Sequence, residues 1–438
     1  MNVYERTQQR LKTVFDRFDN VCVSFSGGKD SGVLLHLCID YVRRKGLKRR
    51  IGVFHMDYEI QYRETIDYVD RMLSENADIL DVYRICVPFK VQTCTSMFQQ
   101  FWRPWEESKR ENWVRRMPDG CFRREDFPFF NETMWDYEFQ NCFEEWLHQR
   151  KKAGRTCFLI GIRTQESFNR WRTIYSDRNH HRFAGKRWIR QWAGGGICNA
   201  YPLYDWLATD VWTANGRFGW PYNRLYDLYH MAGVPLDSQR VASPFISPAI
   251  ANLHLYRTID PTMWGRMIGR VNGANFAALY GKTAAVGWQS ARLPQGLTWE
   301  RYMRFLLSTL PEQTRRNYLE KLSVSIRFWR DKGGCLTDAT IAKLRQAGVR
   351  MEIGDKSNYS RDKKPVRMEY LDDINIPEFN QLPTFKRICI CILKNDYACK
   401  YMGFSPTKGE RLRRRKIMEK YESLLRIREG EGIPEPCI

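Results

Sequence analysis

The sequence lacks the features of a membrane or secreted protein. No apolar run reaches the roughly 18 residues that a membrane span needs. Residues 1–9 show neither the charged region nor the apolar region of a secretory signal. Thirteen cysteines in a chain of this length fit a reducing cytosol better than a disulfide scaffold. We therefore expect a cytoplasmic protein with no membrane partner.

What the chain has in excess is positive charge. Lysine and arginine total 71 against 50 aspartate and glutamate, so the formal net charge is +21. This excess favours a polyanionic partner, either nucleotide phosphates in a pocket or a nucleic-acid backbone along a face. A solvated basic surface is the alternative without a ligand. The 438 residues, of which 43% are hydrophobic and 14% aromatic, are too many for one ordinary core, so two domains are expected.

Strand-like and helix-like segments alternate over the first 90 residues. Alternation of this kind predicts the α/β class, with an open, mostly parallel sheet, flanking helices, and ligands at the carboxyl ends of the strands. The expected segments are a helix at 4–18, a strand at 20–26, a helix at 30–44, a strand at 50–57, a helix at 61–75, a strand at 81–90 and, after a break, a strand at 156–164.

The pattern also predicts where the domains lie. The α/β domain is expected at residues 1–248, with an insertion at about 92–152 that is dense in Trp, Phe and charge and folds over the carboxyl edge of the sheet. Helix-like segments dominate afterwards, so residues 249–438 are expected to form a mainly helical, basic domain. Within it, the polar stretch 355–373 is expected to be a linker or loop, and 408–431 a final basic helix.

The turn "SFSGGKDS" between the first strand and the next helix carries the clearest chemistry. It presents backbone N–H groups at a helix N-terminus, which is a ready anion site. Glycine permits a close approach and positive φ, lysine adds charge, and serine hydroxyls donate to phosphate oxygens. Asp30 either caps the helix or helps to hold a Mg²⁺ ion. The candidate phosphate-binding residues are Ser24, Ser26, Gly27, Gly28, Lys29, Asp30 and Ser31.

This string lacks the Walker spacing and resembles the PP-loop of the ATP pyrophosphatase superfamily. Within the superfamily, the chain is similar to the branch of phosphoadenosine phosphosulfate (PAPS) reductases and sulfate adenylyltransferase small subunits. The resemblance covers residues 20 to about 235 and implies an adenine nucleotide α-hydrolase-like fold. Its other motifs are "VFHMDYEIQYRETIDYV" at 53–69, "GIRTQESFNR" at 161–170, and "YPLYDWLATDVW" at 201–212 followed by "PYNRLYDL" at 221–228.

The resemblance implies an adenine nucleotide, ATP or PAPS, with its phosphates on the loop. Enzymes of the superfamily attack the α-phosphate with an oxygen or sulfur nucleophile and release pyrophosphate, and the loop stabilises the charge that develops. The branch's Asp-Thr-Gly is Asp57-Tyr58-Glu59 here, which changes the segment that contacts the sugar. Further binding residues implied are Asp57, Gly161, Arg163, Ser167 and Arg170. The implied catalytic residues are Lys29, Asp30, Asp57 and Arg163.

PAPS reductase activity itself is not expected, because the Glu-Cys-Gly-type motif that carries the family's thiol is absent. Cys437 lies in a different setting, and the spacing of Cys389, Cys391 and Cys399 fits neither an iron–sulfur cluster nor a zinc ribbon, so we expect these three to be buried. The overall layout resembles the IbrA/YbdN-like group of bacterial PAPS-reductase-related proteins. That resemblance implies a ParB-like partner protein and a connection with gene regulation.

A basic stretch, residues 161–192, interleaves arginine and lysine with Trp, Tyr and His. It suits single-stranded or flipped nucleotides, or equally a lid over a phosphorylated small molecule. Two functions therefore stand. The chain is an enzyme that uses ATP or PAPS to activate or transfer a group, with nucleic acid as one acceptor, or it is a nucleotide-sensing transcriptional regulator with little catalysis.

Overall fold

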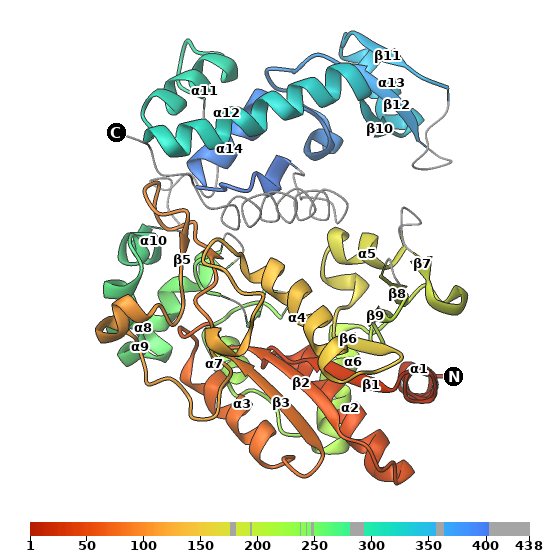
Figure 1. The fold of residues 1–438 in the computed structure, drawn as a ribbon. Helices are drawn as coiled ribbons and strands as arrows, with labels where there is room; N and C mark the ends of the chain where they lie inside the picture. The colour runs from red at the N-terminus through yellow and green to blue at the C-terminus, as the bar shows by residue number, and fades with distance from the viewer. Residues whose placement is uncertain are drawn as a thin grey trace, which may run out of the picture. The chain divides into compact units, whose positions relative to one another are not determined.

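A computed structural model describes residues 1–175, 181–192, 195–236, 238–241, 243–246, 249–280, 293–355 and 363–402. The chain separates into two compact units, Met1–Gln289 and Ser290–Ile438 (Figure 1). The predicted boundary after residue 248 thus falls inside the first unit. The reason is that apolar side chains of residues 250–278 join a cluster that packs on the sheet of that unit.

The first unit is built on a seven-stranded sheet with the order β3-β2-β1-β6-β9-β8-β7. The first five strands in that order pair in parallel, and the β9–β8 and β8–β7 pairs are antiparallel. The predicted α/β class is confirmed. The strands of the sheet are β1 (Asn20–Ser24), β2 (Ile51–Met56), β3 (Leu80–Ile85), β6 (Thr156–Ile160), β7 (His181–Arg182), β8 (Ile189–Gln191) and β9 (Ile197–Ala200).

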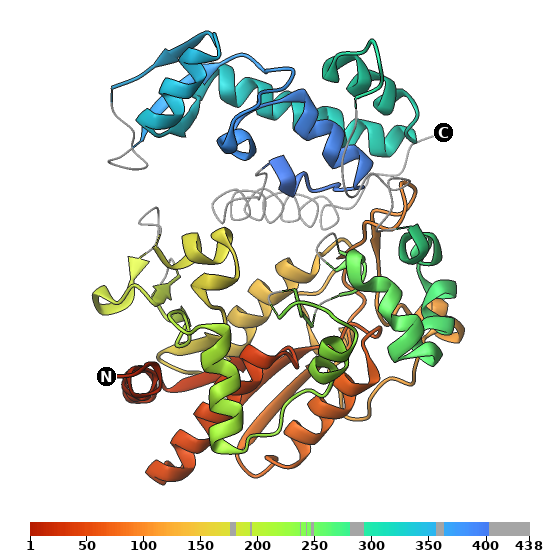
Figure 2. The same cartoon turned by 180° about the vertical axis from the view of Figure 1, so that it is seen from behind.

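Both faces of the sheet are buried, which explains why its strands are continuous apolar runs. Val21 and Val23 of β1 join the cluster formed with α1, α2, α3 and α6, whereas Cys22 between them joins the cluster formed with α4. Figure 2 views the unit from behind. The helices are α1 (Val3–Arg17), α2 (Lys29–Lys45), α3 (Arg63–Ser74), α4 (Asp136–Arg150), α5 (Phe168–Tyr175), α6 (Ala208–Phe218), α7 (Leu225–Met231), α8 (Tyr256–Ile259), α9 (Pro261–Arg270) and α10 (Ala274–Tyr280).

The region between β3 and β6 contains the predicted insertion. It holds the two-stranded sheet of β4 (Val91–Gln92) and β5 (Phe101–Trp102), and it ends in α4, the crossover helix that leads to β6. Aromatic side chains of the insertion and of α4, among them Trp102, Phe127 and Phe139, are buried in one cluster. Their density therefore reflects a core that extends the domain.

The second unit is mainly helical, with α11 (Trp299–Ser308), α12 (Glu312–Arg327), α13 (Asp338–Gln346) and α14 (Phe385–Leu393). It also has an antiparallel sheet of β10 (Gly334–Leu336), β12 (Lys364–Met368) and β11 (Met351–Ile353), in that order. Strand β12 lies in the stretch that was expected to be a loop, where Val366 and Met368 alternate toward a small core. The predicted basic helix at 408–431 lies outside the described residues. No helix in the described ranges is long and apolar enough to cross a membrane.

Candidate functional site

The candidate site lies where the sheet changes direction. Strands β1, β2 and β3 follow one another outward, and the chain then returns to place β6 on the other side of β1. In open α/β sheets, ligands bind at such a switch point, beyond the carboxyl ends of the strands. The loop after β1 and the loop after β6 meet here. Their backbones are so close that a Cβ atom on Gly161 would lie only 3.0 Å from the backbone oxygen of Asp30.

The loop after β1 is a tight turn that requires glycine. Gly27 has φ of +76°, and a Cβ atom there would lie 2.8 Å from Cγ2 of Val69 on α3. Ser26 and Ser31 close the turn, since their hydroxyls are 3.0 Å apart and the Ser31 hydroxyl also donates to the carbonyl of Gly28, at 3.1 Å. These local bonds leave the backbone of the turn preformed at the N-terminus of the 17-residue helix α2.

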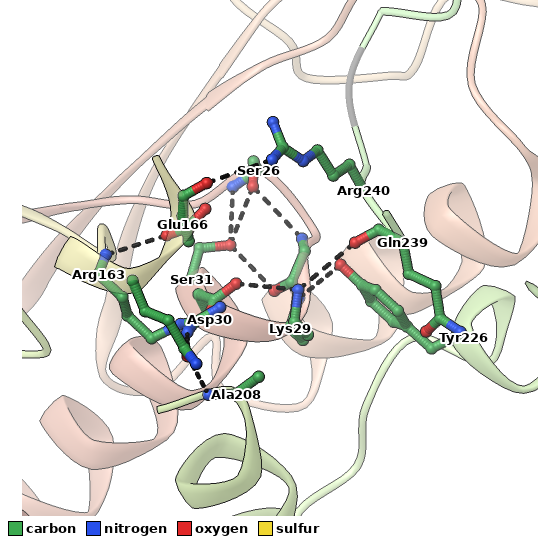
Figure 3. Close-up of polar contacts among 12 residues, drawn as sticks. Ser26, Lys29, Asp30, Ser31, Arg163, Glu166, Ala208, Tyr226, Gln239 and Arg240 are labelled. Carbon is green, nitrogen blue, oxygen red and sulfur yellow. Dashed lines mark hydrogen bonds and ion pairs between the residues drawn. The ribbon is translucent and has the colours of Figure 1, made fainter. Parts of the chain in front are cut away.

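Lys29 is the buried cation of the turn. Its ammonium lies 3.3 Å from Oδ2 of Asp30 and donates to the carbonyl of Gln239 at 3.4 Å. Its backbone N–H donates to the hydroxyl of Tyr226 at 3.0 Å (Figure 3). Burial, opposed by the nearby Asp30 carboxylate, lowers the pKa of Lys29. Polar groups of the protein thus take up donors that a phosphate would use.

Four cations lie around the two carboxylates of Asp30 and Glu166. Arg163 forms an ion pair with Oδ1 of Asp30, and Arg170 forms one with Glu166. Arg240 donates to the backbone carbonyl of Glu166 at 3.4 Å. Lys29, Arg163, Arg170 and Arg240 together outnumber the two carboxylates of Asp30 and Glu166, so the site carries an excess of positive charge. Burial lowers the pKa of Arg170; the Asp30 carboxylate opposes this effect, and the charges of Arg240 and Arg163 add to it.

The "PYNRLYDL" stretch supports the loop directly. Asn223 donates its amide to the carbonyl of Gly27 and to the hydroxyl of Thr65, both at 2.9 Å. Three residues later, Tyr226 contacts Lys29 through its hydroxyl and through its ring, which lies 5.3 Å from the ammonium. In the "YPLYDW" stretch, by contrast, Asp205 pairs with Arg10 of α1 at 2.6 Å, which anchors the first helix. The "PYNRLYDL" motif therefore supports the loop, whereas the "YPLYDW" motif holds α1 in place.

Asp57, which follows β2, lies in a different environment from the loop. It is fully buried and pairs with Arg84 at 3.0 Å and with Arg115 of the insertion. Burial alone would raise the pKa of Asp57, but the charges of Arg115 and Arg84 outweigh it and lower the pKa to about 2. Within the described part of the chain, its carboxylate has no hydrogen bond to a residue of the loop.

Glu59 extends this buried cluster. Its carboxylate accepts from Arg270 of α9 at 3.0 and 3.1 Å, and from the backbone N–H groups of Trp105 at 2.8 Å and Val114 at 3.2 Å. The departure from Asp-Thr-Gly therefore has a structural consequence, because the glutamate holds the insertion against the end of β2. We call Asp57, Glu59, Arg84, Arg115 and Arg270 the ionic cluster.

The structure brings most of the predicted residues together. Ser167 joins by accepting from the backbone N–H of Arg170 at 3.3 Å. The hydroxyl of Ser24 is buried with no hydrogen-bond partner among the described residues. The residues that form or contact the loop are Ser26, Gly27, Gly28, Lys29, Asp30, Ser31, Gly161 and Arg163, with Arg170 near Asp30; Ser24 ends the strand before the loop, and Ser167 contacts Arg170.

The predicted Mg²⁺ role of Asp30 stays a prediction. Both carboxylate oxygens face cations of the protein, Oδ1 toward Arg163 and Oδ2 toward Lys29. In the described ranges, no group of three or more His, Cys, Asp and Glu side chains is placed to bind a metal ion. An ion at this position would therefore draw most of its ligands from nucleotide phosphates and water.

Sequence reasoning missed four residues of the site: Glu166, Tyr226, Gln239 and Arg240. Tyr226 belongs to a motif that was recognised, so its place beside the loop could have been inferred from that motif. Gln239 and Arg240 lie in a segment with no helical or strand periodicity, and no local signal identifies them.

The basic stretch at 161–192 is partly described. Trp171 and Tyr175 stack with ring centroids 5.2 Å apart and are exposed by 45% and 36%. The guanidinium of Arg187 lies 4.9 Å from the Tyr175 ring, whereas Trp188 is buried. This mixture of exposed stacked rings and cations suits a base or nucleotide. Residues 176–180 lie outside the described residues.

The three cysteines at 389, 391 and 399 are buried as expected. Cys389, Cys391 and Cys399 are each fully buried in its apolar cluster. Cys437 lies outside the described residues.

Comparison with known proteins gives two family matches. A model described as "Phosphoadenosine phosphosulfate reductase domain" matches residues 20–259. A second, described as "Domain of unknown function (DUF3440)", matches residues 233–413. The "Uncharacterized protein YbdN" of Escherichia coli (strain K12) is 32% identical over 419 residues, which cover 94% of this chain and 93% of that protein.

Two solved structures show a weaker likeness. PAPS reductase from Candida auris, in its phosphate complex, is 16% identical with a TM-score of 0.28, covering 51% of this chain and 84% of its own. The U34-tRNA thiolase NcsA from Methanococcus maripaludis, with its [4Fe-4S] cluster, is 11% identical with a TM-score of 0.29, covering 67% and 82%. Likenesses of this size carry no argument about function.

Proposed function

The chain belongs to the phosphoadenosine phosphosulfate reductase domain family, as its motifs predicted, and we propose that its loop at residues 24–31 binds the phosphates of an adenine nucleotide, ATP or PAPS. One observation carries the proposal. A preformed glycine turn at the N-terminus of α2 lies at the switch point of the sheet and is surrounded by more cations than carboxylates. Such a site is favourable only for an anion with several oxygens.

The proposed reaction is attack on the α-phosphorus by an acceptor's oxygen or sulfur. The bond from phosphorus to the bridging oxygen breaks, and pyrophosphate leaves with that electron pair. Lys29 and Arg163 would stabilise the charge on the leaving group, which requires fixed donors and no general base. With PAPS, the acceptor attacks the sulfur instead, the bond from sulfur to the bridging oxygen breaks, and adenosine 3′,5′-bisphosphate leaves with that electron pair. Nucleic acid is one acceptor that the exposed rings of Trp171 and Tyr175 would suit.

A second candidate, a nucleotide-sensing regulator with little turnover, is favoured by a different observation. Asp57, expected to be catalytic, is neutralised by Arg84 and Arg115, and the donors of Lys29 are taken up by Tyr226 and Gln239. A protein that only binds nucleotide needs no free carboxylate. If the nucleotide displaces Tyr226, the resulting change of conformation would report that the nucleotide is bound. A ParB-like protein or nucleic acid would recognise the changed conformation.

Nucleotide binding is tested first. We expect Lys29→Ala to weaken binding of ATP or PAPS by about 10- to 100-fold, because it removes a charge-assisted hydrogen bond. Gly28→Val should act similarly, since its Cβ atom would lie 3.3 Å from the Ser26 hydroxyl and 3.4 Å from that of Tyr226. Isothermal titration and thermal shift measure both effects.

The matched control is Lys45→Ala, which removes an exposed lysine from the last turn of the same helix. Unchanged affinity in both loop variants, with the folded structure intact by circular dichroism, would overturn the site. ATP, PAPS and adenosine 3′,5′-bisphosphate are compared in each titration, and a preference for the 3′-phosphate selects PAPS over ATP.

Turnover separates the two candidates. Pyrophosphate release from ATP, and release of adenosine 3′,5′-bisphosphate from PAPS, are measured alone and with single-stranded RNA or DNA. Release that Lys29→Ala abolishes supports the enzyme. Tight nucleotide binding with no release under any of these conditions supports the regulator.

A further inference from the structure

Two cysteines are brought together at the end of β3, outside the loop. Cys86 follows β3 directly, and Cys121 lies in the insertion. Residues 85 and 122 form a parallel bridge, in which the N–H of Cys86 donates to the carbonyl of Phe122 at 2.8 Å and the N–H of Phe122 to that of Arg84 at 2.7 Å. This backbone pairing places the two cysteines on adjoining chain segments, and the side chain of Cys86 lies near enough to that of Cys121 to influence its pKa.

The two thiols are not equivalent. Cys86 is 1% exposed, whereas Cys121 is partly exposed. The hydrogen bond from Cys86, together with the Arg123 side chain, lowers the pKa of Cys121 to about 7. Burial raises the pKa of Cys86 well above its usual value, so that thiol stays protonated. An accessible thiolate beside a buried thiol is the arrangement in which the first is oxidised and the second resolves it.

The two cysteines also lie near the arginines that bind Asp57. We call residues 113–122, the part of the insertion that pairs with the end of β3, the strap. Its Arg115 and the Arg84 of β3 bind the two oxygens of Asp57. A covalent bond between Cys86 and Cys121 would therefore tie together the two chain segments that hold the ionic cluster closed.

We propose that Cys86 and Cys121 form a reversible dithiol–disulfide site that takes a hydroperoxide as its oxidant.

The Cys121 thiolate attacks the terminal oxygen of the hydroperoxide, and the O–O bond breaks. The departing alkoxide or hydroxide takes a proton, and Cys121 becomes a sulfenic acid. The Cys86 sulfur then attacks the Cys121 sulfur, and water leaves with the Cys86 proton. The two thiols lose two electrons in total and the peroxide gains them. A small dithiol reverses the step by exchange.

Peptide mapping of the full chain tests the proposal without any variant. Tryptic cleavage places Cys86 in "ICVPFK" (85–90) and Cys121 in "MPDGCFR" (117–123), each with a single cysteine. After brief treatment with hydrogen peroxide and blocking of free thiols, we expect these two peptides to appear joined and to separate on reduction with dithiothreitol. Free, unjoined peptides at a peroxide dose that oxidises Cys335 would overturn the proposal.

Variants then assign the two roles. Cys86→Ser should leave a sulfenic acid on Cys121 that a 1,3-diketone reagent traps, and Cys121→Ser should abolish both the trapped adduct and the joined peptides. Cys335→Ser, which removes a partly exposed cysteine of the second unit, is the control and should change neither.

The pH dependence of alkylation gives a separate readout. The rate at Cys121 should rise with pH and reach half its maximum near about 7, because the thiolate is the reacting form. A midpoint at the ordinary value of about 8.5 would contradict the activation.

Discussion

Two neighbouring strands, β1 and β2, end at the same edge of the sheet and are followed by opposite kinds of site. After β1, the loop brings together hydroxyls, Lys29 and backbone N–H groups that are bonded within the protein, and the cations around it outnumber the carboxylates. After β2, Asp57 and Glu59 are fully buried and bound by arginines from β3, the insertion and α9.

The difference shows that one edge of the sheet can carry a ligand-binding loop beside a cluster of buried ion pairs that stabilises the fold. The loop is stabilised by short-range contacts that leave an anion site incomplete, whereas the ionic cluster supplies its own anions. A buried charge is tolerable only when it is paired, so the cluster resists opening, and the loop is the part that a ligand can complete.

The largest effect is expected where the cluster is broken. Glu59→Gln should lower the free energy of unfolding by about 3–5 kcal/mol, because it leaves the charge of Arg270 buried with Glu106, at 3.9 Å, as its remaining carboxylate partner among the described residues. Urea unfolding followed by tryptophan fluorescence measures it. Glu107→Gln, which breaks an exposed pair with Arg110, is the control and should cost at most about 1 kcal/mol. Equal costs in the two variants would contradict the comparison.

A side chain added at Gly27 in the loop should lower the free energy of unfolding. Gly27→Ala is expected to cost about 2–3 kcal/mol, because alanine is strained at positive φ and its Cβ atom would lie 2.8 Å from Val69. Gly46→Ala isolates the strain, since Gly46 also has positive φ but no atom lies within 4 Å of a Cβ there. If both variants lose the same stability, close packing of the loop on α3 is not what requires glycine.

Acid should weaken the ionic cluster in a defined range. The pKa of Asp57 falls from 3.8 to about 2 on folding, so its contribution is complete above about pH 4 and is lost as the pH falls through about 2. At roughly 1.4 kcal/mol per pH unit, the contribution is about 2 kcal/mol. The difference in unfolding free energy between the natural protein and Asp57→Asn should shrink by that amount between about pH 5 and about pH 2. A difference that stays constant over this range would exclude the ion pairs as its cause.

The smallest effect concerns the tyrosine on the loop. Tyr226→Phe should strengthen nucleotide binding by about 2- to 10-fold, because the N–H of Lys29 is then free for a phosphate. Tyr222→Phe, which loses a hydrogen bond to Asp227 on the same stretch, should leave affinity unchanged. Weaker binding by Tyr226→Phe would mean that the hydroxyl itself contacts the nucleotide.

Most of the loop could be predicted because its residues are contiguous. The turn from Ser26 to Ser31 follows from glycines, hydroxyls and a helix start that can be read within eight residues. Arg163 was predicted from the family's Gly-x-Arg motif, because the resemblance implies that this segment lies beside the phosphate-binding loop. Arg240 was not, because it reaches the site from a segment with no periodic pattern. The role of Glu59 depends on Arg270, 211 residues away in the sequence.

The domain boundary shows the same limit. The change to helical periodicity after residue 248 was real, but α8, α9 and α10 bury their apolar faces in the first unit. Periodicity reports which face of a helix is apolar and carries no information about which core receives it.

The sequence by itself determined the order of strands and helices, the glycine turn and the family, because each of these depends on residues close together in the chain. Only the tertiary structure decided which cations gather around Asp30, that Asp57 is neutralised by Arg84 and Arg115, and that Cys86 meets Cys121. Ion pairs and hydrogen bonds form only between groups that lie within a few ångströms of each other, and the fold alone determines which distant residues come within that range.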